Sequence, residues 1–305
     1  MPIPDWPGPV SNPRPLWRDA TDESDGMPLY PLKFNLGPLQ ITGFGLMMMA
    51  AFLIAGWVME RDLRSRKLAP DYAWSIVVAG AVGGILGAKL WYFGLHQSWS
   101  ALLSRGGLVW YGGFLGGVAA VIITGLRHKI PTGFTADLVA PALAVGYAIG
   151  RVGCFLIQDD YGRPTDLPWA VKFPEGWPPS TAQNLAAAGV PVPADANPFD
   201  VLAVHPTQLY ETASMLLVFA VLWRMRARPR GTGWLFGLYL AFAGLERFLV
   251  EFLRAKDDRL LGPFTLAQAM SVVVVSVGLT MLVKLREPGP APVKVQADIL
   301  RGPGT

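Results

Sequence analysis

An arginine lies where an apolar helix is expected, within the stretch GYAIGRVGCFLIQDDYGR from Gly146 to Arg163. The guanidinium of Arg151 is permanently charged, and its planar set of donors suits a phosphate or a carboxylate. An ionisable side chain at membrane depth costs at least about 2.5–3.5 kcal/mol on insertion scales, so it usually faces a protein interior and serves a function. Arg151 is therefore the first candidate for an anion-binding site.

A second set of charges lies in the segment ERFLVEFLR, which again interrupts an apolar run. Arg247, Glu251 and Arg254 follow one another at i, i+4 and i+7. This spacing places all three on one face of a helix, where Arg247 and Glu251 can form an ion pair. A purely structural ion pair is one interpretation. The other is that arginines from two separate helices, Arg151 and Arg247, clamp an anion between them.

The elements that must position these charges are strongly apolar. The 305-residue chain is 52% hydrophobic and 16% charged, which is typical of a polytopic membrane protein and not of a soluble enzyme. Segments of roughly 20 apolar residues are each long enough to cross a hydrocarbon core of about 30 Å. They predict an all-α bundle with seven transmembrane helices, at about 38–59, 72–94, 106–125, 135–157, 207–224, 232–253 and 263–284.

Lysine and arginine are concentrated in alternate loops, and short loops rich in these residues stay in the cytoplasm. The basic loops are 60–71, 126–134 and 225–231, whereas 95–105 has a single arginine and 158–206 has two basic and six acidic residues. With seven spans, this pattern predicts an N-terminus outside the cell and a C-terminus in the cytoplasm.

The same reasoning divides the chain into three parts. Residues 1–35 are rich in proline and acidic residues, and we expect an exterior segment there, not a cleaved signal peptide. Residues 36–285 are expected to form a transmembrane domain that holds the site. Within it, 158–206 is long enough to form an exterior cap or a lid. Residues 286–305 are expected to form a cytoplasmic tail.

Glycines recur four positions apart in the second, third and fourth predicted spans. Such spacing lets helix backbones approach closely in lipid, where no hydrophobic force drives helices together. We therefore expect these three helices to form a tight central bundle. The glycines concerned are Gly83 and Gly87, Gly112 and Gly116, and Gly146 and Gly150.

Helix rise places several polar residues at one level of the predicted bundle. At 1.5 Å per residue, Arg151 lies about 24 Å and Arg247 about 22 Å from the cytoplasmic side, in the outer half of the membrane. Tyr111 and Glu211 lie near the outer starts of the third and fifth spans. Lys89, near the outer end of the second span, is either a phosphate contact or a lysine that extends to the interface. An anion at this level, reachable from lipid, is most simply a phospholipid headgroup.

The sequence has no pattern typical of a metal or redox cofactor, so we expect neither. A single cysteine, Cys154, excludes an internal disulfide and a CxxC site. The three histidines, His96, His128 and His205, are too scattered for a metal-ligand spacing. The net charge of +4 comes from loops expected in the cytoplasm. It therefore suits membrane lipids with anionic headgroups and does not indicate nucleic-acid binding.

Six segments within about residues 38–284 carry distinctive motifs: GRVGCFLIQDDYGR (150–163), PWAVKFP (168–174), HPTQLYE (205–211), ERFLVEFLR (246–254), GGLVWYGGFLGG (106–117) and DLVAP (137–141). In their content and order along the chain, these segments resemble the prolipoprotein diacylglyceryl transferase family. The resemblance implies a bacterial inner-membrane, multi-pass enzyme with its active site facing the outer leaflet. Such an enzyme moves the diacylglyceryl group of phosphatidylglycerol to the lipobox cysteine of a preprolipoprotein peptide and releases glycerol phosphate.

The resemblance also implies roles for individual residues. Arg151 and Arg247 would hold the lipid phosphate and stabilise its charge as the carbon–oxygen bond breaks. Glu251 would orient Arg247, while Asp159 and Gly162 would shape the mouth where the peptide enters. A thioether requires a thiolate nucleophile, which a basic cavity favours, and its sulfur belongs to the peptide. The enzyme therefore needs no cysteine of its own. The further substrate-binding candidates are Lys89, Glu211, Arg254 and Cys154.

Four positions depart from the family pattern. Cys154 and Ile157 stand where many members have asparagine, and Phe44 stands in place of a tyrosine. Tyr111 replaces a histidine proposed as a base in some members. Cys154 is either the nucleophile of a variant mechanism or a small apolar filler. Tyr111 is either a hydrogen-bond donor to the lipid, and a candidate catalytic residue, or an interfacial aromatic.

Three alternatives to this transferase stay open at the level of sequence. A paralogue would use another acceptor, and a non-catalytic lipid-binding protein would keep the anion site without the reaction. A lipid transporter would show inverted halves with broken helices near the midplane.

Overall fold

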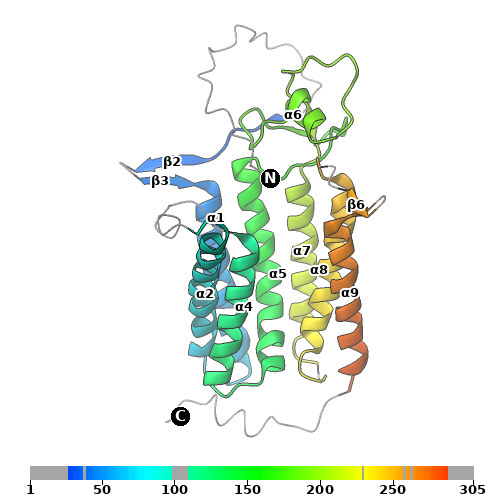
Figure 1. Ribbon diagram of the computed structural model, residues 1–305. Coiled ribbons are helices and arrows are strands. Elements are labelled where there is room, and N and C mark those ends of the chain that lie inside the picture. Colours follow the sequence, from blue (N-terminus) through cyan, green and yellow to red (C-terminus); the bar gives the residue numbers. More distant parts are fainter. Residues whose placement is uncertain are drawn as a thin grey trace.

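The computed structural model describes residues 27–36, 39–97, 109–228, 230–256, 259–261 and 264–287. Within them, seven long helices lie side by side in one bundle (Figure 1). Each largely coincides with one of the apolar segments predicted from the sequence, so the prediction of a mostly helical protein is confirmed. The helices are α1 (Gly43–Ser65), α2 (Asp71–His96), α4 (Trp110–Arg127), α5 (Thr132–Ile157), α7 (Thr207–Met225), α8 (Trp234–Val250) and α9 (Leu266–Lys284).

Five of these described helices, α1, α2, α4, α5 and α9, are long and apolar enough to cross a membrane. Helix α7 opens with the polar run TQLYET, and α8 is 17 residues long with Glu246 and Arg247 close to its end. Both helices bring charged residues to the interior of the bundle, as α5 does with Arg151. The arrangement is that of a helical membrane protein.

Helix α5 is the centre of the bundle, because it contacts α1 on one side and α7 and α8 on the other (Figure 1). Ala140 and Ala144 of α5 are buried in one cluster with Met215 and Leu222 of α7. Val145 belongs to a second cluster that includes residues of α1 and α2. Small side chains on α5 let α7 approach closely, which is how helices associate in lipid.

Specific polar contacts set the helix ends. Thr265 and Gln268 form a capping box at the start of α9, in which each side chain accepts a hydrogen bond from the other's backbone amide. Gln158 ends α5 in a left-handed conformation with φ 64°. At the opposite end of the bundle, Asp137 of α5 accepts a hydrogen bond (2.7 Å) from the amide of Gly233 before α8. This carboxylate ties α5 to the start of α8.

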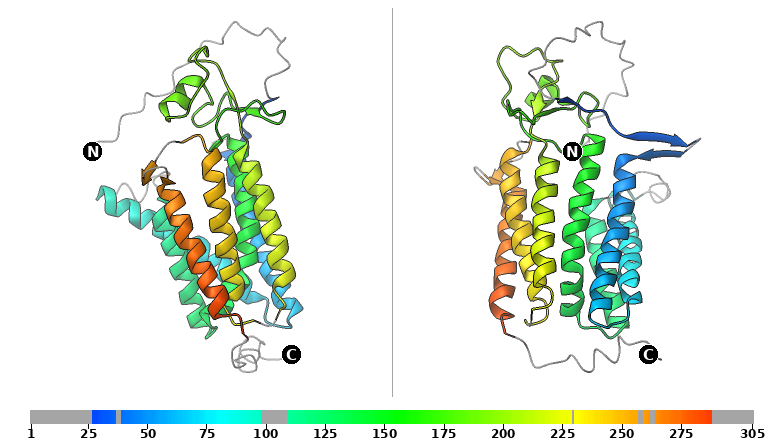
Figure 2. Two further views of the ribbon diagram at one scale, coloured as in Figure 1. Left: turned by 90° about the vertical axis from the view of Figure 1, so that its right-hand side faces the viewer. Right: turned by 180° about the vertical axis from the view of Figure 1, so that it is seen from behind.

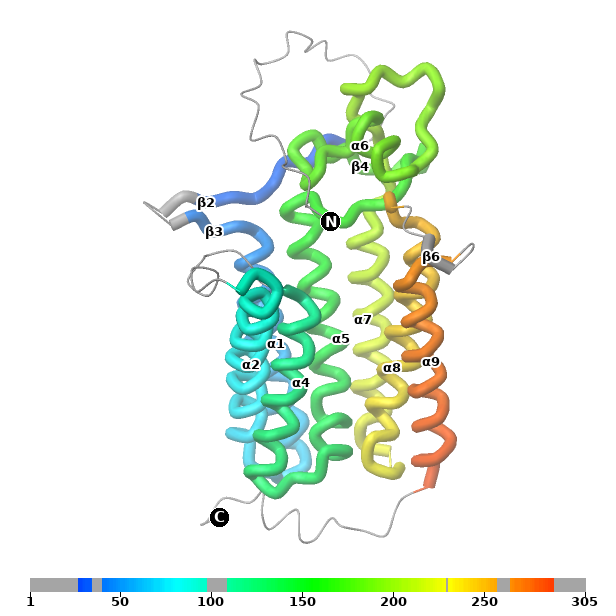
Figure 3. Tube along the Cα trace, viewed as in Figure 1, coloured from blue at the N-terminus to red at the C-terminus, as the bar shows by residue number. Residues whose placement is uncertain are grey.

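Residues 158–206 fold into a small unit beyond one end of the helices, which we call the cap (Figures 2 and 3). Phe173, Leu185 and Val204 are almost fully buried in it and form its own apolar core. A three-stranded sheet of order β1–β4–β5 joins the cap to the N-terminal segment. The cap elements are β4 (Val171–Lys172), α6 (Ala182–Ala187) and β5 (Ala203–Val204), and β1 (Met27–Pro28) pairs in parallel with β4.

Two short hairpins complete the described structure. Strands β2 (Lys33–Leu36) and β3 (Leu39–Thr42) pair before α1. Strands β6 (Arg259–Leu261) and β7 (Phe264–Thr265) pair between α8 and α9. Helix α8 ends in a 3₁₀ turn, η1 (Glu251–Leu253).

The glycine spacing was correctly interpreted for two helices and wrongly for the third. A Cβ atom on Gly87 of α2 would overlap the carbonyl oxygen of Gly112 of α4, so these two backbones touch. On α5, however, a Cβ on Gly146 or Gly150 would meet nothing within 4 Å. The close pair α2–α4 lies beside the bundle centre, not at it (Figures 1 and 2). Helix α5 packs at the centre by means of its small alanine side chains, which contact α7, and not by means of these glycines.

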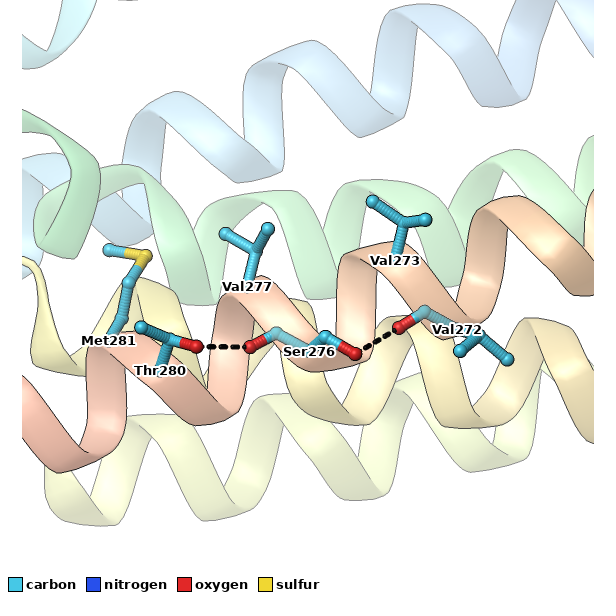
Figure 4. Close-up of a pocket in the computed structure, with 6 residues that line it drawn as sticks. All are labelled: Val272, Val273, Ser276, Val277, Thr280 and Met281. Carbon is cyan, nitrogen blue, oxygen red and sulfur yellow. Dashed lines mark hydrogen bonds between the residues drawn. The ribbon is translucent and has the colours of Figure 1, made fainter.

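Two hollows on the described surface are apolar and lined by no ionisable residue. One, of about 600 Å³, lies between α2 and α4 and is lined by Gly87, Trp91 and Leu115 among others. The other, of about 370 Å³, runs along α9 (Figure 4). Ser276 and Thr280 lie in it, but each hydroxyl donates to a carbonyl of its own helix, at 2.8 and 2.7 Å. Both hollows therefore present hydrocarbon surface, and the polar chemistry lies elsewhere.

Replacing Gly87 with alanine tests the close contact between α2 and α4. The added methyl group would overlap a backbone carbonyl, so the helices must separate, and we expect a loss of about 1–3 kcal/mol in stability. Thermal unfolding of the purified protein in detergent would measure this loss. Gly94→Ala on the same helix is the matched control, because nothing lies within 4 Å of its Cβ position. Equal melting temperatures for the two variants would contradict the close packing.

Candidate functional site

Four helix ends meet at the side of the bundle that carries the cap (Figure 1). α5 and α8 end there, and α7 and α9 begin there, because neighbouring helices run in opposite directions. Charged and polar side chains from these ends contact one another in sequence. We call this set the charge network; its members are Tyr147, Glu211, Arg151, Asp160, Arg254, Glu251 and Arg247.

Arg151 of α5 is the most buried arginine of the network, with 9% of its surface exposed. Its Nη2 donates to Oε1 of Glu211, and its Nη1 donates to Oδ2 of Asp160 at 3.0 Å. Nη1 also lies 3.6 Å from the Sγ of Cys154. Within the described residues, the buried Nε has no hydrogen-bond partner. One donor of Arg151 is thus unused.

Glu211 of α7 holds Arg151 from the interior of the bundle. It is only 1% exposed, and its second oxygen, Oε2, accepts a hydrogen bond of 2.5 Å from the hydroxyl of Tyr147. Both oxygens of this carboxylate are therefore engaged by side chains of α5. A buried carboxylate is stable when it is paired and hydrogen-bonded in this way.

Asp160 joins Arg151 to Arg254 across the end of the bundle. Its Oδ1 accepts from Nη2 of Arg254, and its backbone has the left-handed conformation, with φ 62°. Burial acts to raise the pKa of Asp160, but the charges of Arg254 and Arg151 outweigh it and hold the pKa below its ordinary value. Asp160 is thus ionised at neutral pH and serves as the anion between two guanidinium groups.

Glu251 of η1 forms the other end of the network. It is 5% exposed and lies 2.5 Å from Arg247 Nη1, so the ion pair predicted from the i, i+4 spacing is confirmed. Thr265 Oγ1, at the start of α9, donates to Glu251 Oε1 at 2.9 Å. Arg254 lies farther away, with its Nε 3.7 Å from Glu251 Oε2. Glu251 therefore fixes Arg247 from the interior, and 31% of the Arg247 side chain is exposed.

The predicted single helical face of Arg247, Glu251 and Arg254 is wrong in one detail. The helix narrows to the 3₁₀ turn η1 at Glu251, and Arg254 already has extended backbone angles. Arg254 consequently turns toward Asp160 in the loop after α5. Arg151 of α5 and Arg254, which follows η1, are joined through that aspartate, a connection that helical spacing does not predict.

The remaining candidates lie at different distances from this network. Cys154 is partly buried beside Arg151. The backbone oxygen of Asp159 accepts from Gln208 at 2.6 Å, and the pKa of its carboxyl is raised by burial and by the adjacent Asp160. Gly162 is a packing residue, because a Cβ there would lie 2.7 Å from a backbone oxygen of Leu253.

Tyr111 and Lys89 lie on helices that supply no member of the charge network. Tyr111 is half exposed near the start of α4, and its ring packs edge-on against Trp110 with centroids 5.2 Å apart. Lys89 lies in the last turns of α2. Neither residue is therefore a member of the charge network.

Sequence reasoning missed several polar residues of the site. In the sequence, Tyr147 looks like an ordinary aromatic residue of an apolar helix. Nothing in the sequence distinguishes Asp160 from the adjacent Asp159 as the partner of an arginine. Glu246 is buried, and Ser214 Oγ donates to it at 3.4 Å. An acidic residue directly before Arg247 within an apolar run was a usable signal for Glu246, by the same reasoning that identified Arg151.

Comparisons with known proteins find relatives that share one name. A family model described as prolipoprotein diacylglyceryl transferase matches residues 31–284. A phosphatidylglycerol–prolipoprotein diacylglyceryl transferase of Geobacter sulfurreducens is 35% identical over 277 residues, which cover 85% of this chain and 97% of the relative. The enzyme of that name from Xanthomonas campestris is 32% identical, with 83% and 90% covered. That from Aromatoleum aromaticum is 31% identical, with 84% and 95% covered.

The match of the family model spans the helical bundle and every member of the charge network. Together with the five apolar helices, they indicate a multi-pass membrane protein and a transferase. The chain belongs to the prolipoprotein diacylglyceryl transferase family.

Proposed function

We propose that this protein transfers the diacylglyceryl group of phosphatidylglycerol to the lipobox cysteine of a preprolipoprotein. The relatives of this chain bear the name of that reaction. The observation that carries the proposal is the charge network itself, which holds the guanidinium groups of Arg151 and Arg247 at the meeting point of four helices. Such a site suits an anionic group at the end of an apolar molecule.

The reaction joins the peptide sulfur to the terminal diacylglyceryl carbon and breaks the bond between that carbon and a phosphate oxygen. The electron pair of the broken bond stays on the phosphate, which leaves as glycerol phosphate, and the thiol proton ends on that product or on solvent. Negative charge grows on the leaving oxygen in the transition state. Fixed guanidinium donors stabilise that charge without having to reorganise.

The carboxylates position the arginines in this mechanism. Glu211 is held by Tyr147 and fixes Arg151, while Glu251 is held by Thr265 and fixes Arg247. Long arginine side chains otherwise lose rotamer freedom when they bind a ligand. The two carboxylates remove this cost before the lipid arrives, which is preorganisation.

We further propose that α7 and α8 also cross the membrane, which gives seven spans. They lie alongside α5 and α9 over similar lengths (Figures 1 and 2). The connections α1–α2, α4–α5 and α7–α8 lie together at the end opposite the cap and carry the basic loops, which favours a cytoplasmic position for that end. The cap and the charge network then face the exterior of a bacterial inner membrane, at the outer leaflet.

Peptide entry on the cap side fits the same arrangement. Asp159 lies at the junction of α5 and the cap, and its carboxyl is partly buried. We assign it to the entrance for the lipobox peptide. Tyr111 and Lys89 stay predicted lipid contacts, at the outer ends of the α2–α4 pair.

Replacing either network arginine with alanine tests the anion site. With phosphatidylglycerol and a lipobox peptide in detergent, we expect Arg151→Ala and Arg247→Ala to lose at least about 100-fold in activity, as when an oxyanion donor is removed. Mass spectrometry would detect the thioether, and a coupled assay would detect glycerol phosphate. Arg64→Ala is the control, because that side chain is 67% exposed near the end of α1 opposite the cap. A folded Arg151→Ala variant with full activity would contradict the proposal.

Replacing Cys154 with serine separates two chemical roles for this thiol. Its Sγ lies 3.6 Å from Arg151 and makes at most a weak hydrogen bond, so we expect activity to fall no more than about fivefold. The same mass-spectrometric assay measures the rate. Complete loss of product, together with a diacylglyceryl adduct on the wild-type Cys154, would show instead that the enzyme's own thiol is the nucleophile.

A further inference from the structure

Asp160 holds two arginines by its two carboxylate oxygens. Oδ2 accepts from Arg151 at 3.0 Å, and Oδ1 accepts from Arg254. One guanidinium comes from α5 and the other from the segment after η1. Bridging of two guanidinium groups through separate oxygens is also how a phosphate binds to an arginine pair. The aspartate thus occupies a position that suits a phosphate.

The two carboxylates that hold Arg151 differ in how firmly they are fixed. Glu211 is 1% exposed and bonded to Tyr147 as well as to Arg151. The Asp160 side chain is 36% exposed, and within the described residues its carboxylate accepts hydrogen bonds from Arg151 and Arg254 alone. Its backbone is held independently, because Thr207 Oγ1 donates to the Asp160 carbonyl at 2.9 Å. The carboxylate can therefore leave while the loop stays in place.

Arg151 also has one hydrogen-bond donor that is not used. The Arg151 side chain is 10% exposed, and its buried Nε lacks a hydrogen-bond partner among the residues described. Two carboxylate oxygens cannot satisfy all of its donors. A phosphate offers more oxygens, in a tetrahedral arrangement, and can engage donors that the aspartate leaves unused.

The charges of the network lead to the same conclusion. Its three arginines face three carboxylates, so the network is balanced without a ligand. A bound phosphate diester adds one negative charge, which is costly in a partly buried site. Movement of the exposed Asp160 carboxylate into solvent removes one negative charge and restores the balance.

We propose that Asp160 is a built-in competitor for the phosphate site, displaced from Arg151 and Arg254 when the ligand's phosphate enters and returning when the product leaves. The identity of the ligand as a phosphate ester rests on the proposed function. Asp160 then sets how tightly the phosphate is held and aids product release. It is a positioning residue, since it acts through the two arginines and leaves them when the substrate is present.

Asp160→Asn tests this competition, because the amide keeps the shape and loses the charge. We expect phosphate binding to tighten at least about threefold, the effect of losing one partly exposed ion pair. The measurements are the inhibition constant of glycerol phosphate and the KM for phosphatidylglycerol in mixed micelles. Tightening for both would place the soluble product and the lipid at one position. Tightening for the lipid alone would assign the position to the headgroup of a membrane-held ligand.

Two further variants separate competition from a merely structural role. Asp160→Glu keeps the negative charge and should restore weaker binding. Asp166→Asn is the matched control, because Asp166 is an exposed acidic residue of the same cap, and it should leave both constants unchanged. Unchanged or weaker phosphate binding in folded Asp160→Asn would overturn the proposal, since a structural tie between Arg151 and Arg254 predicts that result.

Separate measurements of phosphate binding and of thioether formation distinguish the competitor role of Asp160 from the transfer reaction. Binding of glycerol phosphate can be followed by its effect on the melting temperature, with no peptide and no turnover. If the wild type forms no thioether but Asp160→Asn still binds glycerol phosphate more tightly, the competitor role stands and the transfer reaction does not. If the wild type forms the thioether and binding does not tighten, only the competitor role fails.

Discussion

The burial of the Arg151 guanidinium is the constraint on which the rest of this structure depends. A permanent charge cannot be taken out of water and left unpaired, because its desolvation costs several kcal/mol or more. The chain meets this requirement with carboxylates from two other parts of the sequence, Glu211 at the start of α7 and Asp160 in the loop after α5. Those two contacts hold together the end of α5, the start of α7 and the first residues of the cap.

The same requirement explains where α7 and α8 lie. α7 opens with a polar run and α8 is the shortest of the long helices described, and they carry Glu211 and Arg247. Both contact α5 and one another, while α9 packs against α8. Polar residues in these helices thus face protein, whereas Val273 and Val277 on the apolar surface of α9 are exposed.

Local spacing in the sequence predicted part of the site. The pair Arg247–Glu251 lies within one helical turn, so a helix is sufficient to bring the two residues together. The long apolar runs likewise predicted the helices. The ion pairs of Asp160 were not predictable in this way, because they join residues 9 and 94 positions apart.

The choice between neighbouring acidic residues depends on backbone conformation. Asp159 and Asp160 are alike in type, and the left-handed residues Gln158 and Asp160 decide which carboxylate turns toward the arginines. The spacing of glycines likewise does not show which of them lie at a helix contact. Gly87 and Gly146 both recur at four-residue spacing, yet only Gly87 contacts another backbone, since contact depends on which helix lies opposite.

The contact between α2 and α4 has a consequence for motion in the bilayer. Because the carbonyl of Gly112 meets Gly87 directly, no side chains lie between the two backbones to slide or to change rotamer. Packed backbones without intervening side chains have few alternative arrangements. If the bundle opens sideways next to α2 and α4, these two helices therefore move together as one rigid body. The bending then takes place in the connections from α1 to α2 and from α4 to α5.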